Sequence, residues 1–192
     1  MNSLIPALFT PQGGVQAKGQ PASPDQQKTA LIEKAGGRVA AIAQNDPRLE
    51  VDFHLQGASV GDAALAAVAA LKDVVQLNLG KTGITDAGLA QIKGITSLTR
   101  LHLEQTKISD KGLANLKGLI NLEYLNLYGT EITDRGLEEL AGLSKLKNLY
   151  VWQTKVTETG VGKLKKALPS LEIVTGWEQK EEPKEKDPKE KK

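Results

Sequence analysis

The chain contains no cysteine and few of the residues that usually carry chemistry. Its 192 residues include two His, one Met, two Trp, three Tyr and two Phe. Without cysteine, neither a disulfide nor a thiolate metal ligand can form. Two histidines are also few for a metal centre or for general acid–base catalysis. We therefore expect no enzyme activity, no cofactor and no metal ion.

A strong charge of one sign and long apolar runs are lacking as well. The formal net charge is +2 at pH 7, which is too small to indicate the concentrated basic surface that binds nucleic acids or anionic membranes. No apolar run approaches the roughly 20 residues that a membrane-spanning helix needs. We expect no nucleic-acid binding and no membrane insertion. A chain of 192 residues is long enough for one domain with its own core, and we expect a monomer.

The two ends of the chain differ from its middle. Residues 1–23 contain a short apolar run, LIPALF, and then VQA, which is similar to a signal-peptidase site. They are either the end of a secretory signal peptide or a disordered leader and linker. We favour export to the periplasm or cell envelope, with a cytoplasmic location as the alternative. Residues 178–192 contain only Glu, Gln, Lys, Asp and Pro, so we expect a disordered charged tail.

Between these ends the sequence repeats itself. Residues 84–107, 108–131 and 132–155 follow one another without a gap. Each unit starts with I-[TS]-D-x-G-L or a close variant, and each contains L-x-x-L-x-[LV]-x-x-T near its end. A fixed period of this length is typical of a solenoid, in which each unit buries its apolar edge against its neighbours.

The second half of each unit predicts a strand. Leu125 and Leu127 alternate with polar residues, so one face of the strand is buried and the other faces outward. Stacked units then form a parallel sheet. Thr130 and its equivalents follow each strand, where a hydroxyl can bond to backbone groups of the turn.

The first half of each unit predicts a short helix. Thr133 is a suitable N-cap, Asp134 adds negative charge to the first turn, and Leu137 lies on the core side. A glycine column runs through these helices, where its helix propensity is unfavourable. It makes sense if neighbouring helices approach closely there. The column consists of Gly88, Gly112, Gly136 and Gly160.

These motifs resemble the leucine-rich repeat family, in its bacterial 24-residue type with TDxGL in the helical half. The resemblance covers about residues 60–173. It implies a right-handed α/β solenoid with a parallel sheet on the concave side, short helices on the convex side and about six strands. Thr stands at the turn position where Asn or Cys is more usual, which indicates a variant subclass.

The start of the domain is expected to be an N-terminal cap. Residues 24–35 have a helical pattern that ends at two glycines, and residues 38–43 can form a strand. Stepping back 24 residues from Leu77 and Leu79 places Phe53 and Leu55 in the buried positions of the first repeat strand. We therefore expect one domain at 24–177, with a helix-and-hairpin cap at 24–59 and repeats at 60–177.

The outward-facing positions of the strands are unusual for an exposed sheet. All three tyrosines and one tryptophan fall there, in two adjacent repeats. Tyrosine, tryptophan and arginine are enriched at interface hot spots. The sequence therefore predicts a partner-binding patch with Tyr124, Tyr128, Tyr150 and Trp152 as anchors and Arg100, His102, Glu104 and Asn126 as the polar rim.

Three functions are consistent with this patch. The favoured one is a non-catalytic module that binds an unidentified protein or peptide. The alternative is a module that binds a glycan or cell-envelope polymer, since Tyr and Trp also stack on sugar rings. Catalysis is disfavoured because an open sheet has neither a nucleophile–base pair nor a closed pocket. His54 and His102 are too far apart to share a metal ion. The remaining interpretation is that the aromatic residues have a purely structural role.

Overall fold

The computed structural model describes residues 24–177. The predictions for residues 1–23 and 178–192 therefore lie outside the described part of the chain. In chain order the elements are α1 (Pro24–Lys34), β1 (Arg38–Ala41), β2 (Leu49–Asp52), η1 (His54–Ser59), α2 (Ala63–Ala69), β3 (Val74–Asn78), α3 (Asp86–Ile92), β4 (Arg100–His102), α4 (Asp110–Leu113), η2 (Ala114–Leu116), β5 (Tyr124–Asn126), α5 (Asp134–Glu138), β6 (Asn148–Tyr150), α6 (Glu158–Ala167) and β7 (Glu172–Val174).

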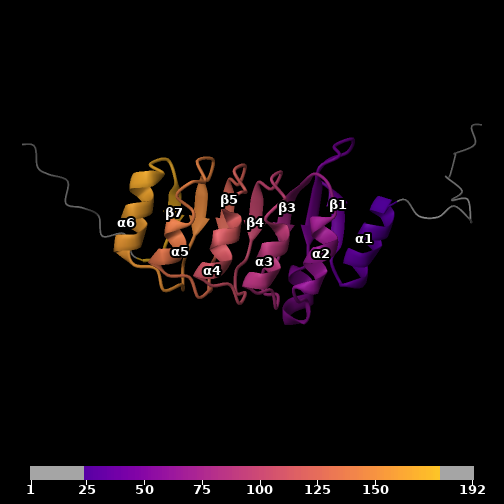
Figure 1. Ribbon diagram of the computed structural model, residues 1–192, viewed down its shortest axis with the longest axis horizontal. Helices are drawn as coiled ribbons and strands as arrows, with labels where there is room; N and C mark the ends of the chain where they lie inside the picture. Colours follow the sequence, from indigo (N-terminus) through magenta and orange to yellow (C-terminus); the bar gives the residue numbers. More distant parts are fainter. Residues whose placement is uncertain (1–23, 178–192) are drawn as a thin grey trace, which may run out of the picture.

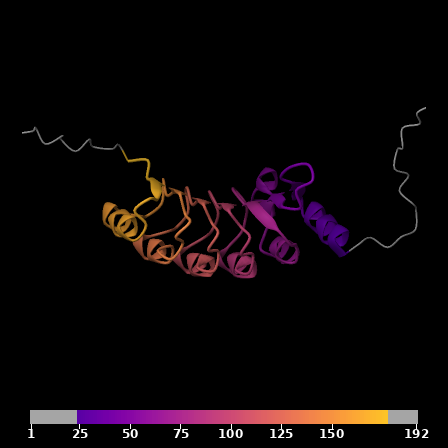
Figure 2. The same cartoon turned by 90° about the horizontal axis from the view of Figure 1, so that it is seen from above.

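The described strands form one seven-stranded sheet in sequence order, from β1 to β7. β1 and β2 pair antiparallel, and each later strand pairs parallel with the one before it. The α-helices lie on one side of this sheet (Figure 1). From above, they follow the outer side of a shallow arc and the strands follow the inner side (Figure 2). The predicted α/β solenoid is therefore confirmed, with seven strands instead of about six.

The core is a column of aliphatic side chains between the sheet and the helices. Leu77, Leu101, Leu125 and Leu149 face one another in register across β3 to β6, and all four are fully buried. Leu89, Leu113 and Leu137 cover them from the helical side. Replacing one of these leucines by alanine would cost about 3 kcal/mol of stability, because the rigid stack collapses only partly around the cavity.

The threonine after each strand has the role that its position predicts. Its hydroxyl donates a hydrogen bond of 2.5–2.6 Å to the carbonyl oxygen three residues earlier. Thr82, Thr106 and Thr130 are buried, so these bonds satisfy polar groups that water cannot reach. The column consists of Thr82, Thr106, Thr130 and Thr154.

Each repeat forms one coil of the solenoid, and an aspartate at the start of its helix connects this coil to the next one. The carboxylate of Asp110 accepts bonds from the backbone N–H of Thr133 at 2.7 Å and from its hydroxyl at 2.6 Å. The same pair of bonds recurs at each junction, and we call the series the aspartate ladder. Its pairs are Asp62–Thr85, Asp86–Ser109, Asp110–Thr133 and Asp134–Thr157. The aspartates thus bridge neighbouring coils in addition to placing charge at the helix starts.

The glycine column makes room for this ladder. A Cβ on Gly136 would overlap Asp110 Oδ1 and would lie 2.9 Å from Ile132 Cγ2. The close approach predicted at these glycines is present. The contact is with the side chain of the aspartate that begins the neighbouring helix, which for Gly136 is Asp110. Larger side chains would collide with a carboxylate that the backbone N–H and the hydroxyl of Thr133 hold in place.

The cap has the expected elements but a shifted register. The helix and the antiparallel hairpin precede the repeats as predicted. Val51, and not Phe53, pairs with Leu77. The N–H of Phe53 donates to the Asn78 carbonyl at 2.9 Å, and Leu55 is 83% exposed. The prediction that Leu55 is buried in the first repeat strand is therefore wrong by two residues. A shift of two keeps each side chain on its own face, so the alternation of polar and apolar residues could not detect it.

Candidate binding surface on the concave face

The outward side chains of three neighbouring strands meet on the concave face. The strand register places Arg100, Tyr124 and Asn148 side by side, and likewise His102, Asn126 and Tyr150. Glu104, Tyr128 and Trp152 follow two residues beyond the ends of these strands. The predicted site residues therefore gather on one surface, which we call the concave patch. It consists of Arg100, His102, Glu104, Tyr124, Asn126, Tyr128, Tyr150 and Trp152.

One group of rings centres on Tyr124. Its ring centroid lies 4.8 Å from that of His102 and 5.3 Å from that of Tyr150. The guanidinium carbon of Arg100 lies over the Tyr124 ring, 4.4 Å from its centroid. Burial, the neighbouring Tyr150 and the charge of Glu104 raise the pKa of the Tyr124 hydroxyl despite the opposing charge of Arg100. At neutral pH this hydroxyl is therefore protonated and can donate a hydrogen bond.

A second group joins Tyr128 and Trp152. Their rings are stacked, with centroids 5.2 Å apart and an interplanar angle of 29°. Gly176 has a φ of +70°, and a Cβ on it would overlap the five-membered ring of Trp152. The indole thus packs between a tyrosine and a backbone segment, yet Trp152 is 50% exposed. A rigid, half-exposed tryptophan loses little conformational entropy when it binds a partner.

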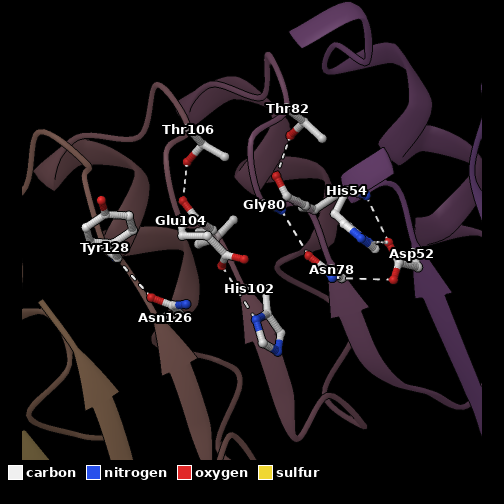
Figure 3. A network of polar contacts seen from close by, with 12 residues as sticks. Asp52, His54, Asn78, Gly80, Thr82, His102, Glu104, Thr106, Asn126 and Tyr128 are labelled. Carbon is white, nitrogen blue, oxygen red and sulfur yellow. Dashed lines mark hydrogen bonds and ion pairs between the residues drawn. The ribbon is translucent and has the colours of Figure 1, made fainter. Parts of the chain in front are cut away.

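A histidine–carboxylate pair lies beside these rings. Glu104 Oε2 is 3.5 Å from His102 Nδ1, and the Glu104 side chain lies over Gly80, where a Cβ would collide with it. Burial would raise the pKa of the Glu104 carboxyl. The interaction with His102 and the charge of Lys81 outweigh burial, and the pKa is below its usual range. Figure 3 shows Glu104 beside Gly80, with its carboxylate pointing toward His102. Glu104 is therefore an ionised group, and its buried Oε2 has no hydrogen-bond partner among the described residues.

Asn126 has a structural contact that sequence reasoning missed. Its Oδ1 accepts a bond from the backbone N–H of Tyr128 at 3.1 Å. Asn78 and Asp52 make the same bond to the N–H two residues further on, as Figure 3 shows. Asn favours this local turn, and the recurrence of Asn78 and Asn126 two repeats apart was the available signal. Asn126 is thus occupied in closing its turn, unlike the aromatic members of the patch.

A second histidine pair lies at the cap end of the face. His54 Nδ1 is 2.6 Å from Asp52 Oδ1, and Asn78 donates to Asp52 Oδ2 at 3.4 Å. Within residues 24–177 no group of three or more His, Asp or Glu side chains is arranged to hold a metal ion. In the same part of the chain, none of the helices has the length and apolarity needed to cross a membrane.

Two of the comparisons with known proteins found a match. The family model described as "Leucine Rich repeat" matches residues 94–117 and 118–141, two consecutive segments in the middle of the solenoid. A crystal structure of internalin C2 from Listeria monocytogenes is similar, with 23% sequence identity and a TM-score of 0.44. The match covers 57% of this chain and 54% of the internalin chain, so it spans about half of that protein. None of the curated proteins compared with the chain matches it significantly.

Proposed function

We propose that this chain, whose fold is an α/β leucine-rich-repeat solenoid, is a non-catalytic module that binds a protein or peptide through its concave patch. The supporting observation is the arrangement of the four patch aromatics in two pairs of contacting rings, one tilted and one stacked, on the solvent side of adjacent strands. Aromatic side chains that are buried on one side and exposed on the other are typical of interface hot spots. We further propose that the chain belongs to the bacterial 24-residue type of these repeats and that it is exported.

The neighbouring polar groups support binding more than catalysis. Arg100, His102 and Glu104 lie side by side on an open sheet. The Glu104 carboxylate interacts with His102 and is partly covered. A catalytic site would need a nucleophile held against a base in a site that excludes water. The patch has the composition of a recognition surface instead, with a cation, hydroxyls and aromatic rings.

Affinity capture from the source cells tests this proposal. The full-length chain serves as bait beside the variant Tyr124→Ala/Tyr150→Ala/Trp152→Ser. A matched control replaces exposed apolar residues elsewhere, Leu31→Ser/Leu55→Ser/Ile120→Ser, whose side chains are 59%, 83% and 58% exposed. We expect the partner to bind the wild type and the control but not the patch variant. If the patch variant remains folded by circular dichroism and captures the same partner, the proposal is wrong.

A glycan or cell-envelope polymer is the alternative ligand, because Trp152 is half-exposed and indole rings stack on sugars. The two alternatives separate when a soluble cell-wall oligosaccharide is added to the capture assay. Loss of the captured partner at low oligosaccharide concentration would favour the glycan. Unchanged capture, together with sensitivity of the partner to protease, favours the protein.

A further inference from the structure

We infer that the concave patch binds an extended acidic peptide, with a carboxylate on Arg100 and an apolar or aromatic side chain on Trp152, about five residues apart. The inference rests on the proposed function and adds the chemistry and spacing of the partner. Four features of the patch lead to it: an exposed cation without an ion-pair partner, a partly buried carboxylate, a half-exposed tryptophan packed against its neighbours, and the distance between the two anchors.

Arg100 is the unpaired cation of the patch. Among residues 24–177 no carboxylate forms an ion pair with Arg100, whereas His102 faces Glu104 and the nearby Lys147 binds Glu123 at 2.8 Å. The guanidinium instead lies over the Tyr124 ring. A guanidinium that stacks face to face on an aromatic ring keeps its N–H donors available in its plane. Those donors suit a carboxylate, which can accept two parallel hydrogen bonds from them.

The charge of the patch favours an acidic partner. Glu104 is its only carboxylate, and it is partly buried over Gly80 beside His102. The exposed charge of the patch is therefore that of Arg100, which is positive, although it also acts on the nearby Glu123 carboxylate. Complementary charge across an interface speeds encounter and disfavours partners of the wrong sign. A basic segment would place like charges together and would be disfavoured.

Trp152 provides the apolar anchor. It is held between Tyr128 and the backbone at Gly176 and exposes half of its surface. Val174, on the adjacent edge strand, is 39% exposed and enlarges the apolar area. A partner side chain that packs here would bury apolar surface on a group that is already ordered, which is the usual property of a hot spot.

The stacked rings favour a peptide over a sugar. A sugar ring stacks on the free face of an aromatic ring. The Tyr124 ring already carries Arg100, and the Trp152 ring already stacks on Tyr128. Both rings therefore have fewer free faces than a sugar-binding platform needs. Peptide side chains can instead pack against ring edges, and the peptide backbone can bond to the Tyr124 hydroxyl.

The strand register sets the distance between the two anchors. Arg100 is aligned with Asn148 two strands away, and Trp152 lies four residues beyond Asn148. Two strand spacings and four residues of strand give a diagonal of about 16 Å. An extended peptide spans about 16 Å in five residues. The partner segment should therefore carry its acid and its apolar residue four to six positions apart.

Nuclear magnetic resonance with defined peptides tests the inference on the full-length protein. The probe is Asp-Thr-Ser-Thr-Ser-Trp with blocked ends, and a second probe has the reversed sequence. Two matched peptides carry Asn or Lys in place of Asp. A third has one residue instead of four between Asp and Trp. The reporters are the Arg100 Nε–H and the Trp152 indole N–H. Arg135→Gln, an exposed arginine on α5, is the control for Arg100→Gln.

We expect the Asp peptide to bind about fivefold more tightly than the Asn peptide, as for a favourable exposed ion pair. Arg100→Gln should abolish this difference and Arg135→Gln should not. The peptide with the one-residue spacer should bind more weakly. The inference would be overturned if the Asp and Asn peptides bound with equal affinity or if the Lys peptide bound more tightly. It would also be overturned if the two reporter signals did not shift at about 5 mM peptide. An acidic oligosaccharide that shifts both reporters at lower concentration than any peptide would overturn it as well.

The capture assay separates this inference from the proposed function. If the Arg100→Gln bait keeps a partner that the aromatic variant loses, the concave patch is a binding site but its ligand does not depend on a carboxylate. If both baits keep the partner, both proposals are wrong. If both lose it, and the peptide series gives the expected order, both are supported.

Discussion

The aspartate ladder and the concave patch are made by the same repeating units, yet only the ladder repeats its chemistry. Each of its four junctions pairs an aspartate with a Thr or Ser, with bonds of 2.5–2.8 Å. On the concave face, the aligned column changes residue at every strand: Gln76, Arg100, Tyr124, Asn148 and Glu172. Side chains that hold one coil to the next must match in every coil. Side chains that face solvent are free to differ, and their differences can define a binding surface.

The largest loss of stability is expected for a substitution in the glycine column. Gly136→Ala places a methyl group against the Asp110 carboxylate and Ile132. It should lower the free energy of unfolding by about 3 kcal/mol, through overpacking and disturbed ladder bonds. Gly142→Ala is the control, since nothing lies within 4 Å of a Cβ there. Urea denaturation measures both, and equal stability of the two variants would contradict the packing role of the column.

The second largest loss of stability is expected at the aspartate ladder. Asp110→Ala leaves the part-buried N–H and hydroxyl of Thr133 without their acceptor, which should cost about 2 kcal/mol. Asp110→Asn should cost less, because its amide oxygen can still accept the N–H bond. Glu131→Ala removes an exposed ion pair with Lys155 and should change stability by less than about 0.5 kcal/mol. Thermal or urea unfolding measures these losses. A larger loss of stability for Glu131→Ala than for Asp110→Ala would contradict the prediction.

The concave patch should matter less for stability than for binding. Trp152→Ser removes the stack on Tyr128 and should cost about 1 kcal/mol of stability, in the range of an aromatic pair. Affinity for the captured partner should fall more than about tenfold, as at a hot spot. Unfolding curves and binding titrations on the same sample provide both values. A stability loss as large as that of Gly136→Ala, with unchanged binding, would make the patch structural.

The smallest effect concerns pH. The backbone N–H and the hydroxyl of Thr157 donate to Asp134 and hold its pKa below the ordinary value of 3.8. Because the folded pKa is lower than the unfolded one, the ionised carboxylate stabilises the fold above about pH 4. This contribution is lost as the pH falls through the folded pKa.

Thr157→Val removes one of the two donors and should raise the Asp134 pKa toward the ordinary value. Carbon-13 titration of the carboxyl signals measures it. Thr154→Val is the matched control, since the Thr154 hydroxyl donates to the Val151 carbonyl and not to a carboxylate. An Asp134 pKa that is equal in the wild type and in Thr157→Val would show that the hydroxyl bond does not contribute.

The sequence was sufficient to predict features with a local period. Alternation placed Leu125 and Leu127 in the core and Tyr124 and Asn126 outside, and the structure agrees. The threonine column also has its predicted backbone bonds. These predictions succeed because they depend only on the two-residue period of a strand and on the repeat length.

Predictions that needed the contact between coils were less complete. The glycine column was predicted to lie close to the neighbouring helix, and it does, but the sequence did not show that the contact is with the aspartate that begins this helix. Asn126 was assigned to a polar rim, but its oxygen closes a turn. At the cap, the two-residue shift of Phe53 was invisible because it changes the partner of a side chain without changing its face.

The sequence alone therefore determined the solenoid, its buried column and the membership of the aromatic surface, since each follows from spacing along the chain. The tertiary structure decided which atoms meet. It places Lys81, Gln105, Gly129 and Gln153 in the same left-handed conformation although three of them are not glycine. It also brings Arg100 over Tyr124 of the next coil. Both depend on neighbouring coils, whose packing can outweigh a local preference of about 1–2 kcal/mol against such backbone angles.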